Sequence, residues 1–324
     1  MRYFKFSLPL FLILLFSFSS GNYRTRVYKK AYKSFEKTNP EFVYVPGGTW
    51  SSLNDRHKVG PMVHDNKWQQ NVTQSFWMSK YEVTNARWQE FVKDIRQRYG
   101  LDSSKNLLPD TNLWTGQLLY NEPMRKYYYR HPAYKNYPVV NISITQSEAF
   151  CKWLGERIQS SESGAYLDSV VVRLPTDLEW EYAASGIQGG SVYPWGTDYL
   201  RSTKGVFMAN FRLLPINEAR KEDGKIKLEV DYSTSNPDFT TAPVDMYGSN
   251  ELGLYQMGGN VAEFVTATNA SDVESEKGVS CGGSFYDPPY YMQCHARDYY
   301  PTHSSAHFTR GLRPVVTFKL KEVQ

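Results

Sequence analysis

The stretch Gly253-Leu-Tyr-Gln-Met-Gly-Gly-Asn-Val-Ala-Glu-Phe264, followed by Gly282-Gly-Ser-Phe285, decides the fold of this chain. Clustered glycines permit tight turns in which backbone groups approach one another closely. The first motif contains a carboxylate, Glu263, and the second is followed by YDPPYYMQCHAR over residues 286–297. The two motifs predict a site lined by backbone. Reactive side chains would lie in residues 286–297, which offer one cysteine and one histidine.

Composition predicts one aromatic-rich domain. The chain has 324 residues, of which 41% are hydrophobic and 15% aromatic, with 25 Tyr and 8 Trp. Aromatic rings bury large areas while Tyr and Trp keep a polar atom, which suits an irregular fold with many loops. The net charge of +4 is mild, and no stripe of Lys and Arg alternates with stacking aromatics. The composition therefore gives no support to nucleic-acid binding.

The N-terminus has the pattern of a secretory signal peptide over residues 1–21. Arg2 and Lys5 precede an apolar run from Leu8 to Phe18, and Ser-Ser-Gly21 forms a small-residue cleavage site. We expect export to the periplasm or to an outer-membrane-associated position. Membrane association would come only through an uncleaved signal or through a partner, because no second segment is apolar enough to span a bilayer.

The remainder predicts an exposed leader over residues 22–40 and one domain over residues 41–320. Three cysteines, Cys151, Cys281 and Cys294, allow at most one internal disulfide. Cys151 lies on the apolar face of a predicted helix, so we expect it to be buried and inert.

Local patterns predict few helices, short strands and long ordered loops, that is, an irregular α+β domain. Alternating apolar residues predict strands over 42–45 and 75–79. Thr84 is expected to cap a helix, whereas the Pro- and Asn-punctuated insertion over residues 100–137 favours ordered loop over helix. A polar excursion follows over residues 215–240.

Two sequences have the capping-box pattern, in which a Thr and a Glu three residues later satisfy backbone N–H groups at a helix start. The first is Thr145-Gln-Ser-Glu148, and the second is Thr176-Asp-Leu-Glu179, whose helix ends at Gly186. Both predict a helix that starts directly after the Thr.

These motifs, in this order, resemble the formylglycine-generating enzyme, or sulfatase-modifying factor, family. The resemblance covers residues 42–318 and includes VYVPGGTW (43–50), MSKYEVTNARWQEFV (78–92), RLPTDLEWEYAASG (173–186) and the two glycine motifs. It implies an irregular mixed α/β fold related to C-type lectins.

Within that family, LLPDTNLW (107–114) and NEPMRKYYYRHPAYKNYPVV (121–140) resemble the gliding-motility lipoproteins GldK, PorK and GldJ. Those proteins build or support the periplasmic ring of the type IX secretion and gliding machinery. The resemblance implies protein partners in an envelope secretion or motility complex. Two features depart from that branch: no lipid-attachment cysteine follows the apolar run, and the chain is short.

The family's enzymes oxidise a substrate cysteine with copper held by two thiolates just after the Gly-Gly-Ser motif, and Cu(I) prefers such soft sulfur ligands. Counted from Ser284, the first ligand position carries Asp287, and the second falls among residues 289–292, which end at Met292. Cys294 matches a structural cysteine of the family. We therefore predict that copper is not bound and that the chain has no catalytic residues. A copper site of Cys294, Met292 and His295 is disfavoured because adjacent residues rarely converge on one ion. No Ser-His-Asp arrangement surrounds Ser284.

The family also binds calcium, an ion that takes six to eight oxygen ligands. The resemblance assigns this role to Gly259, Val261 and Glu263, whereas an internal hydrogen bond of Glu263 is the alternative. Gln256 stands where a further ligand is expected, and it is neutral. A weaker second calcium set would comprise Asn210, the Phe211 carbonyl and Asp238.

Five further charged residues lie in the family motifs, and pairing between Arg and carboxylate explains them more simply than catalysis. They are Arg173, Glu179, Glu181, Arg297 and Arg313. The sequence thus favours a non-catalytic structural or binding component of a secretion or gliding assembly. The alternatives are an active oxidase, or other oxygen-using enzyme, of the same fold and a carbohydrate-binding module.

Overall fold

The computed structural model describes residues 21–53, 68–114, 122–186, 191–213, 216–222, 225–230, 240–268, 277–301 and 306–321. The helices are α1 (Gly21–Thr38), α2 (Asn85–Tyr99), α3 (Leu101–Lys105), η2 (Thr111–Trp114), α4 (Glu122–Tyr127), η3 (Pro132–Tyr134), α5 (Ile144–Gln159), η4 (Ser163–Tyr166), α6 (Asp177–Ser185) and η5 (Pro289–Met292). The strands are β1 (Phe42–Val45), β2 (Gly48–Leu53), β3 (Trp68–Thr73), β4 (Phe76–Ser79), β5 (Leu167–Arg173), β6 (Ile216–Glu222), β7 (Lys225–Val230), β8 (Ala262–Val265), β9 (Lys277–Cys281), β10 (Asp298–Pro301), β11 (Arg310–Gly311) and β12 (Val315–Leu320).

The first sheet joins the two ends of the domain. Its strand order is β1-β4-β12-β5, and all its pairs are antiparallel. β12, near the C-terminus, lies between β4 and β5, so Val316 pairs with Trp77 on one side and Val172 on the other. The predicted strands over 42–45 and 75–79 are confirmed as β1 and β4.

The second sheet places the glycine motifs side by side. Its order is β10-β9-β8-β11, and Glu263 on β8 pairs with Cys281 on β9 and with Gly311 on β11. Gly282 and Ser284 follow directly after β9, so they emerge next to the strand that carries Glu263. Two separate hairpins, β2–β3 and β6–β7, complete the strands, the latter within the predicted polar excursion.

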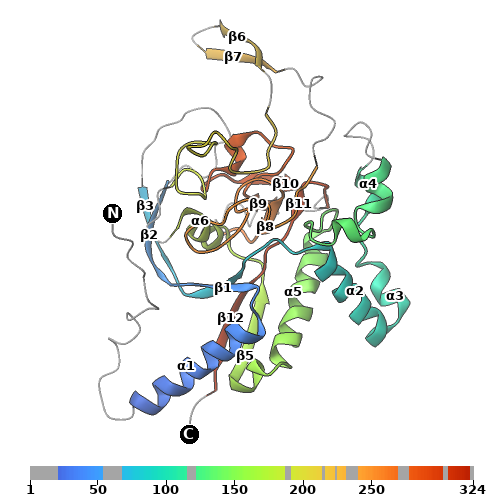
Figure 1. Cartoon of the computed structure of the whole chain (residues 1–324), viewed down its shortest axis with the longest axis vertical. Coiled ribbons are helices and arrows are strands. Elements are labelled where there is room, and N and C mark those ends of the chain that lie inside the picture. Colours follow the sequence, from blue (N-terminus) through green and yellow to red (C-terminus); the bar gives the residue numbers. More distant parts are fainter. Residues whose placement is uncertain are drawn as a thin grey trace.

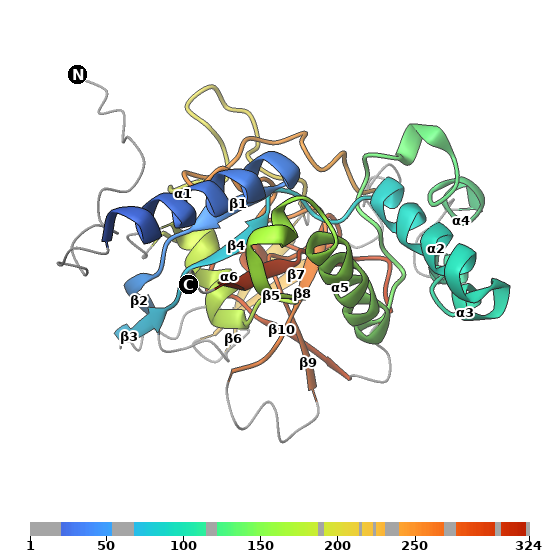
Figure 2. The ribbon, with the colours of Figure 1, turned by 90° about the horizontal axis from the view of Figure 1, so that it is seen from below.

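The predicted exposed leader is wrong, because most of residues 22–40 form α1, which packs against the first sheet. Figure 2 shows α1 lying across β1 and β4. Phe35 is 0% and Ala31 1% exposed. The Phe35 ring lies 4.9 Å from that of Trp77 and 5.1 Å from that of Phe318. The many Lys and Arg residues in this segment favoured an exposed leader, although its apolar residues recur at helical spacing and form one face. Within the described residues, no helix is long and apolar enough to cross a membrane.

The helix starts confirm two cap predictions and correct a third. The Thr84 side chain accepts a hydrogen bond from the Arg87 N–H, and Thr176 and Glu179 form the predicted capping box. α5, however, begins at Ile144, because Ser143 and Gln146 form the box instead of Thr145 and Glu148. Both sequences have the required pattern, but Ser143 has the extended backbone of a cap residue, with φ −89° and ψ 165°.

The insertion over residues 100–137 is not the predicted loop, since it contains α3, η2, α4 and η3. Its prolines and asparagines limit each helix to between three and six residues. Figures 1 and 2 place α3 and α4 together with α2 on one side of the molecule, away from α1.

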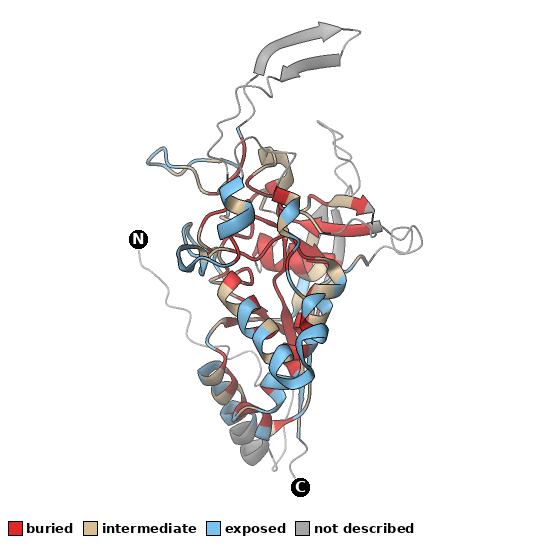
Figure 3. Ribbon diagram, turned by 90° about the vertical axis from the view of Figure 1, so that its right-hand side faces the viewer, coloured by how far each residue is buried: buried red, intermediate tan, exposed pale blue. Residues whose placement is uncertain are grey.

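Aromatic packing dominates the interior, which Figure 3 shows as a continuous buried centre. Trp88 and Phe91 of α2 pack against Phe150 and Trp153 of α5 in stacked, T-shaped and tilted pairs, with ring centroids 5.3–5.5 Å apart. Such pairs contribute about 0.5–1.5 kcal/mol each beyond their buried area. All three cysteines are free and buried, as predicted for Cys151.

Candidate functional site

The Gly-Asn-Val turn holds four segments together through the side chain of Asn260. Gly259 has φ +80°, and a Cβ there would lie 2.4 Å from the Asn210 carbonyl oxygen, so the position requires glycine. The Asn260 Nδ2 donates to Glu82 Oε2 (2.8 Å) and to the Ala242 carbonyl (3.2 Å). Its Oδ1 accepts from the Ala242 N–H (2.7 Å) and from Asn210 Nδ2 (3.3 Å). The turn is therefore a structural junction.

Glu82 was not singled out in the sequence, although it lies in the quoted motif MSKYEVTNARWQEFV. Its side chain is 2% exposed and accepts hydrogen bonds from Asn260 and from the Val261 N–H. Burial, followed by the nearby Glu263 carboxylate, raises the pKa of Glu82 well above its usual range, whereas Arg313 opposes the shift.

Glu263 forms a buried ion pair with Arg313. The two residues are 1% and 0% exposed, and Arg313 Nη2 lies 2.6 Å from Glu263 Oε1. Arg313 Nε lies 2.9 and 3.0 Å from the two carboxylate oxygens, and the Trp180 indole N–H donates to Oε2 at 2.7 Å. The remaining guanidinium N–H groups donate to the carbonyls of Ser79, Lys80 and Tyr255. Glu263 is therefore bonded within the protein, which is the alternative to a role as a calcium ligand.

The predicted first calcium set does not fit this arrangement. Glu263 is its one carboxylate, and a guanidinium already neutralises that charge. A divalent cation there would face Arg313 at close range. Gln256 offers one neutral oxygen, Oε1, which is buried and has no hydrogen-bond partner within the described chain. It lines a cavity of about 10 Å³, about the size of one water molecule.

The second predicted calcium set is only partly described. Asn210 Nδ2 donates to the Thr240 carbonyl at 2.9 Å, and Phe211 packs into a small buried cluster with Met292. Asp238 lies outside the described residues, so this set stays a prediction.

Asp287 stands at the position where the resemblance places the first copper thiolate, and its side chain is hydrogen-bonded to Ser284 across a turn. Ser284 is 0% exposed, and its Oγ donates to Asp287 Oδ2 at 2.5 Å. The Ser284 N–H donates to the same oxygen at 2.9 Å, and Ser284 Oγ accepts from the Tyr286 N–H. Burial raises the pKa of Asp287, and the bonds from Ser284 oppose that shift. None of the described hydrogen bonds of Ser284 involves a histidine.

The sulfur atoms do not fit copper either. Met292 at the end of η5 is buried among Tyr193, Ala209 and Phe211, whereas Cys294 packs in a different core cluster. Burial raises the pKa of Cys294 well above its usual value, and that of Cys281 to about 12. Because Met292 and Cys294 lie in different core clusters, the structure does not bring the two sulfur atoms together as a ligand pair.

The five charged residues expected to be structural do form Arg–carboxylate pairs. Arg297, 2% exposed, donates to Glu181 Oε2 at 2.7 Å and lies 3.3 Å from Asp177 Oδ2. Arg173 binds Glu179 through two hydrogen bonds of 2.6 and 2.7 Å. These pairs fasten β5 and the segment that carries Arg297 to α6, and the Arg313–Glu263 pair fastens the segment before β12 to β8. Asp177, which sequence reasoning missed, stands at the first position of α6.

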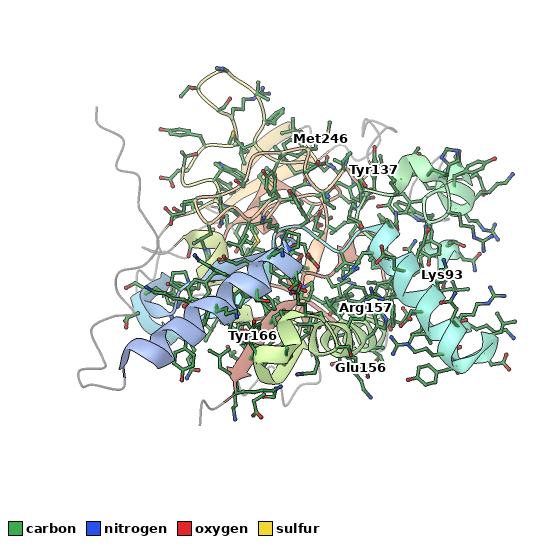
Figure 4. The ribbon with its side chains drawn as sticks, turned by 60° about the horizontal axis from the view of Figure 1, so that its bottom comes forward. Lys93, Tyr137, Glu156, Arg157, Tyr166 and Met246 are labelled. Carbon is green, nitrogen blue, oxygen red and sulfur yellow. The ribbon has the colours of Figure 1, made fainter. Side chains whose placement is uncertain are left out.

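The insertion packs over the segment that follows the second glycine motif. Trp114 and Tyr128 share a buried cluster with Phe285 and Phe308. The Tyr128 hydroxyl donates to the Pro138 carbonyl at 2.6 Å. Tyr137 packs partly buried against this cluster, and Figure 4 shows it on the side of the molecule that carries α4. The insertion therefore covers Phe285 with aromatic side chains.

Comparison with known proteins agrees with this geometry. The sulfatase-modifying factor enzyme 1-like domain matches residues 28–318. Over 260 residues the chain is 26% identical to the inactive C-alpha-formylglycine-generating enzyme 2 of Mus musculus, covering 71% of this chain and 70% of that protein. It is 27% identical to the formylglycine-generating enzyme of Mus musculus over 215 residues, covering 59% of this chain and 48% of that protein.

Solved structures share the fold. PvdO from Pseudomonas aeruginosa has a TM-score of 0.55 at 18% identity, covering 85% of this chain and 93% of its own. CarF has a TM-score of 0.51 at 18% identity, covering 85% and 97%. The match over residues 28–318 and this common fold show that the chain belongs to the sulfatase-modifying factor, or formylglycine-generating enzyme, family.

Proposed function

We propose that this chain is a non-catalytic, exported member of its family that acts as a binding or assembly component of an envelope secretion or gliding-motility complex. The observation that carries the proposal is the Asp287–Ser284 turn. The position that the resemblance assigns to a copper thiolate is an aspartate that accepts two hydrogen bonds from Ser284. The side chain at this position stabilises a loop and supplies no sulfur ligand.

Two further points support a binding role. The insertion over residues 100–137 packs Trp114 and Tyr128 against the loop after the second glycine motif. The curated relatives also include a formylglycine-generating enzyme named inactive, so the family fold serves proteins without that chemistry. A family member without that chemistry would act by binding other molecules through its surface.

The insertion exposes apolar side chains that suit a protein interface. Leu101 is 50% and Tyr127 42% exposed. Tyrosine is among the side chains that most often anchor protein–protein contacts.

Affinity purification of the tagged full-length protein from its native envelope tests the proposal. We expect recovery of a stable complex with envelope proteins. The double variant Leu101→Ser/Tyr127→Ser should lose that complex. The matched control Val206→Ser/Met246→Ser, altered at residues 63% and 65% exposed outside the insertion, should retain it. Recovery of the unaltered protein as a free monomer would contradict the assembly role.

A further inference from the structure

The outward side of α1 carries four exposed lysines, which together are called the lysine face: Lys29, Lys30, Lys33 and Lys37. Three of them recur every four residues, so they lie along one side of a helix with 3.6 residues per turn. The buried residues Ala31 and Phe35 lie on the opposite side, and Phe35 packs against the first sheet. The lysine face therefore points away from the domain.

Positive charge is concentrated on α1. The helix contains six basic residues and one acidic residue, a net charge of +5, whereas the whole chain carries +4. The chain outside α1 thus has a small negative net charge, although it supplies most of the residues. An anionic surface would be attracted to this helix before any other part of the molecule.

The charges of α2 show what an ordinary solvated helix of this chain looks like. Arg87 pairs with Glu90 at 2.6 Å, and Asp94 pairs with Arg98, so opposite charges stand three or four residues apart. On α1 the one acidic residue is Glu36, and within the described residues no carboxylate forms an ion pair with the lysine face. Like charges four residues apart repel each other, and an anionic partner would relieve that repulsion.

We propose that the lysine face docks α1 flat against an anionic phospholipid bilayer, with its ammonium groups at the phosphates of the lipid headgroups. A helix of 18 residues is about 27 Å long, so its lysines present a line of charge that suits a plane. Protein interfaces are depleted in Lys, whereas anionic bilayers attract Lys through its charge alone. The apolar run Leu8–Phe18, which precedes α1 in the sequence, would bring this part of the chain to a bilayer during export.

Docking through α1 needs neither a spanning segment nor a partner, so it adds a third route to the two that the sequence led us to expect. It also leaves the insertion free, because α3 and α4 lie with α2 on one side of the molecule, away from α1 (Figures 1 and 2). The inference thus goes beyond the proposed assembly role and does not depend on it.

Sedimentation of the full chain with lipid vesicles tests the inference. One vesicle is pure phosphatidylcholine, and the other contains about 30% phosphatidylglycerol, which is anionic. We expect binding to be at least about tenfold tighter with phosphatidylglycerol at about 0.1 M salt, and the difference to shrink at about 0.5 M salt because salt screens exposed charges.

The variant Lys29→Gln/Lys33→Gln/Lys37→Gln identifies the surface that binds. Gln keeps the helix propensity of Lys, and the three side chains are exposed, so the fold should be retained by circular dichroism. Each lysine near an anionic surface contributes about five-fold in affinity. The variant should therefore bind phosphatidylglycerol vesicles at least about 30-fold more weakly, and its binding to phosphatidylcholine should not change.

The matched control makes the same change in net charge elsewhere, on exposed lysines of α2, α3 and α4: Lys93→Gln/Lys105→Gln/Lys126→Gln. Figure 4 shows Lys93 on α2, on the side of the molecule that carries the insertion. The control should bind within about two-fold of the unaltered chain, because these lysines would face away from the bilayer.

A fluorophore reports the docked face directly. The cysteines Cys151, Cys281 and Cys294 are buried, so a cysteine introduced at the surface is labelled selectively. A label on Glu36→Cys should be quenched by phosphatidylglycerol vesicles that contain a headgroup quencher, whereas a label on Lys126→Cys should not.

Equal affinity for the two vesicles would overturn the inference, as would equal weakening in the two triple variants or equal quenching of the two labels. A chain that enters an envelope complex but does not bind phosphatidylglycerol vesicles would overturn this inference alone. The proposed assembly function would then stand.

Discussion

Replacing Arg313 by methionine should destabilise the domain more than other single surface or core-edge changes of similar size. Arg313 is 0% exposed and pairs with Glu263, itself 1% exposed. The substitution keeps much of the aliphatic volume but leaves the carboxylate buried without its cation. Removing one partner of a buried pair costs about 3–5 kcal/mol. The carbonyls of Ser79, Lys80 and Tyr255 also lose their donors, so we expect a loss near the upper end of that range.

Urea unfolding at pH 7, followed by tryptophan fluorescence and circular dichroism, measures this loss. Lys105→Met is the matched control, because the Lys105 side chain is 60% exposed in its ion pair with Asp102. Its free energy of unfolding should change by no more than about 0.5 kcal/mol. The double variant Arg313→Met/Glu263→Met should be more stable than Arg313→Met by at least about 1 kcal/mol, since it leaves no buried charge unpaired.

A decrease of less than about 1 kcal/mol in the free energy of unfolding of Arg313→Met would refute the reasoning, because a buried carboxylate without its partner should destabilise the fold by more than that. A double variant less stable than Arg313→Met would also contradict it. Either result would mean that another cation, and not Arg313, balances Glu263.

Three further predictions test other parts of the molecule. Phe35→Ala should lower the free energy of unfolding, measured in urea, by about 3–5 kcal/mol, because the ring is fully buried against Trp77. A decrease of less than about 1 kcal/mol would mean that residues 22–40 behave as an exposed leader after all. Burial, and then Arg310, lowers the pKa of His307 to about 4 from 6.5. Since the unfolded state binds that proton more readily, stability should fall as the pH decreases from 6.5 towards 4, and His307→Asn should reduce the fall. A parallel decline in both proteins would exclude this cause. In the variant Asp238→Ala, which lacks the carboxylate of the second predicted calcium set, calcium at about 5 mM should shift the melting temperature by less than about 1 °C, because Glu263 is already paired, and a larger calcium-specific shift would contradict that account.

The regular elements of the fold could be predicted because their signals are local. Alternation in Phe42–Val45 and the caps at Thr84 and Thr176 depend on neighbours within a few residues. The sequence did not predict α1 because its charged residues outnumber the two fully buried ones, Ala31 and Phe35. The buried face of this helix becomes evident only from its packing against the first sheet. The start of α5 was ambiguous, since Ser143 and Thr145 both satisfy the same pattern and tertiary packing selects one.

The residue types of the candidate site could be predicted from the sequence, but the partners with which its charged side chains pair could not. The absence of thiolates at position 287 is visible in the sequence, and so is the carboxylate of Glu263. The partner of Glu263 is Arg313, 50 residues away, and no local pattern links the two.

Oxidation of a cysteine-containing peptide is the most direct test of the central claim that this chain lacks its family's chemistry. The full chain, supplied with Cu(I), oxygen and a thiol as the two-electron reductant, would be incubated with the peptide, and the products followed by mass spectrometry. We predict that the cysteine is not converted to an aldehyde above the level in the same mixture without the chain, because Asp287 stands at the thiolate position and is hydrogen-bonded to Ser284. Repeated turnover of the peptide to the aldehyde would contradict the non-catalytic account.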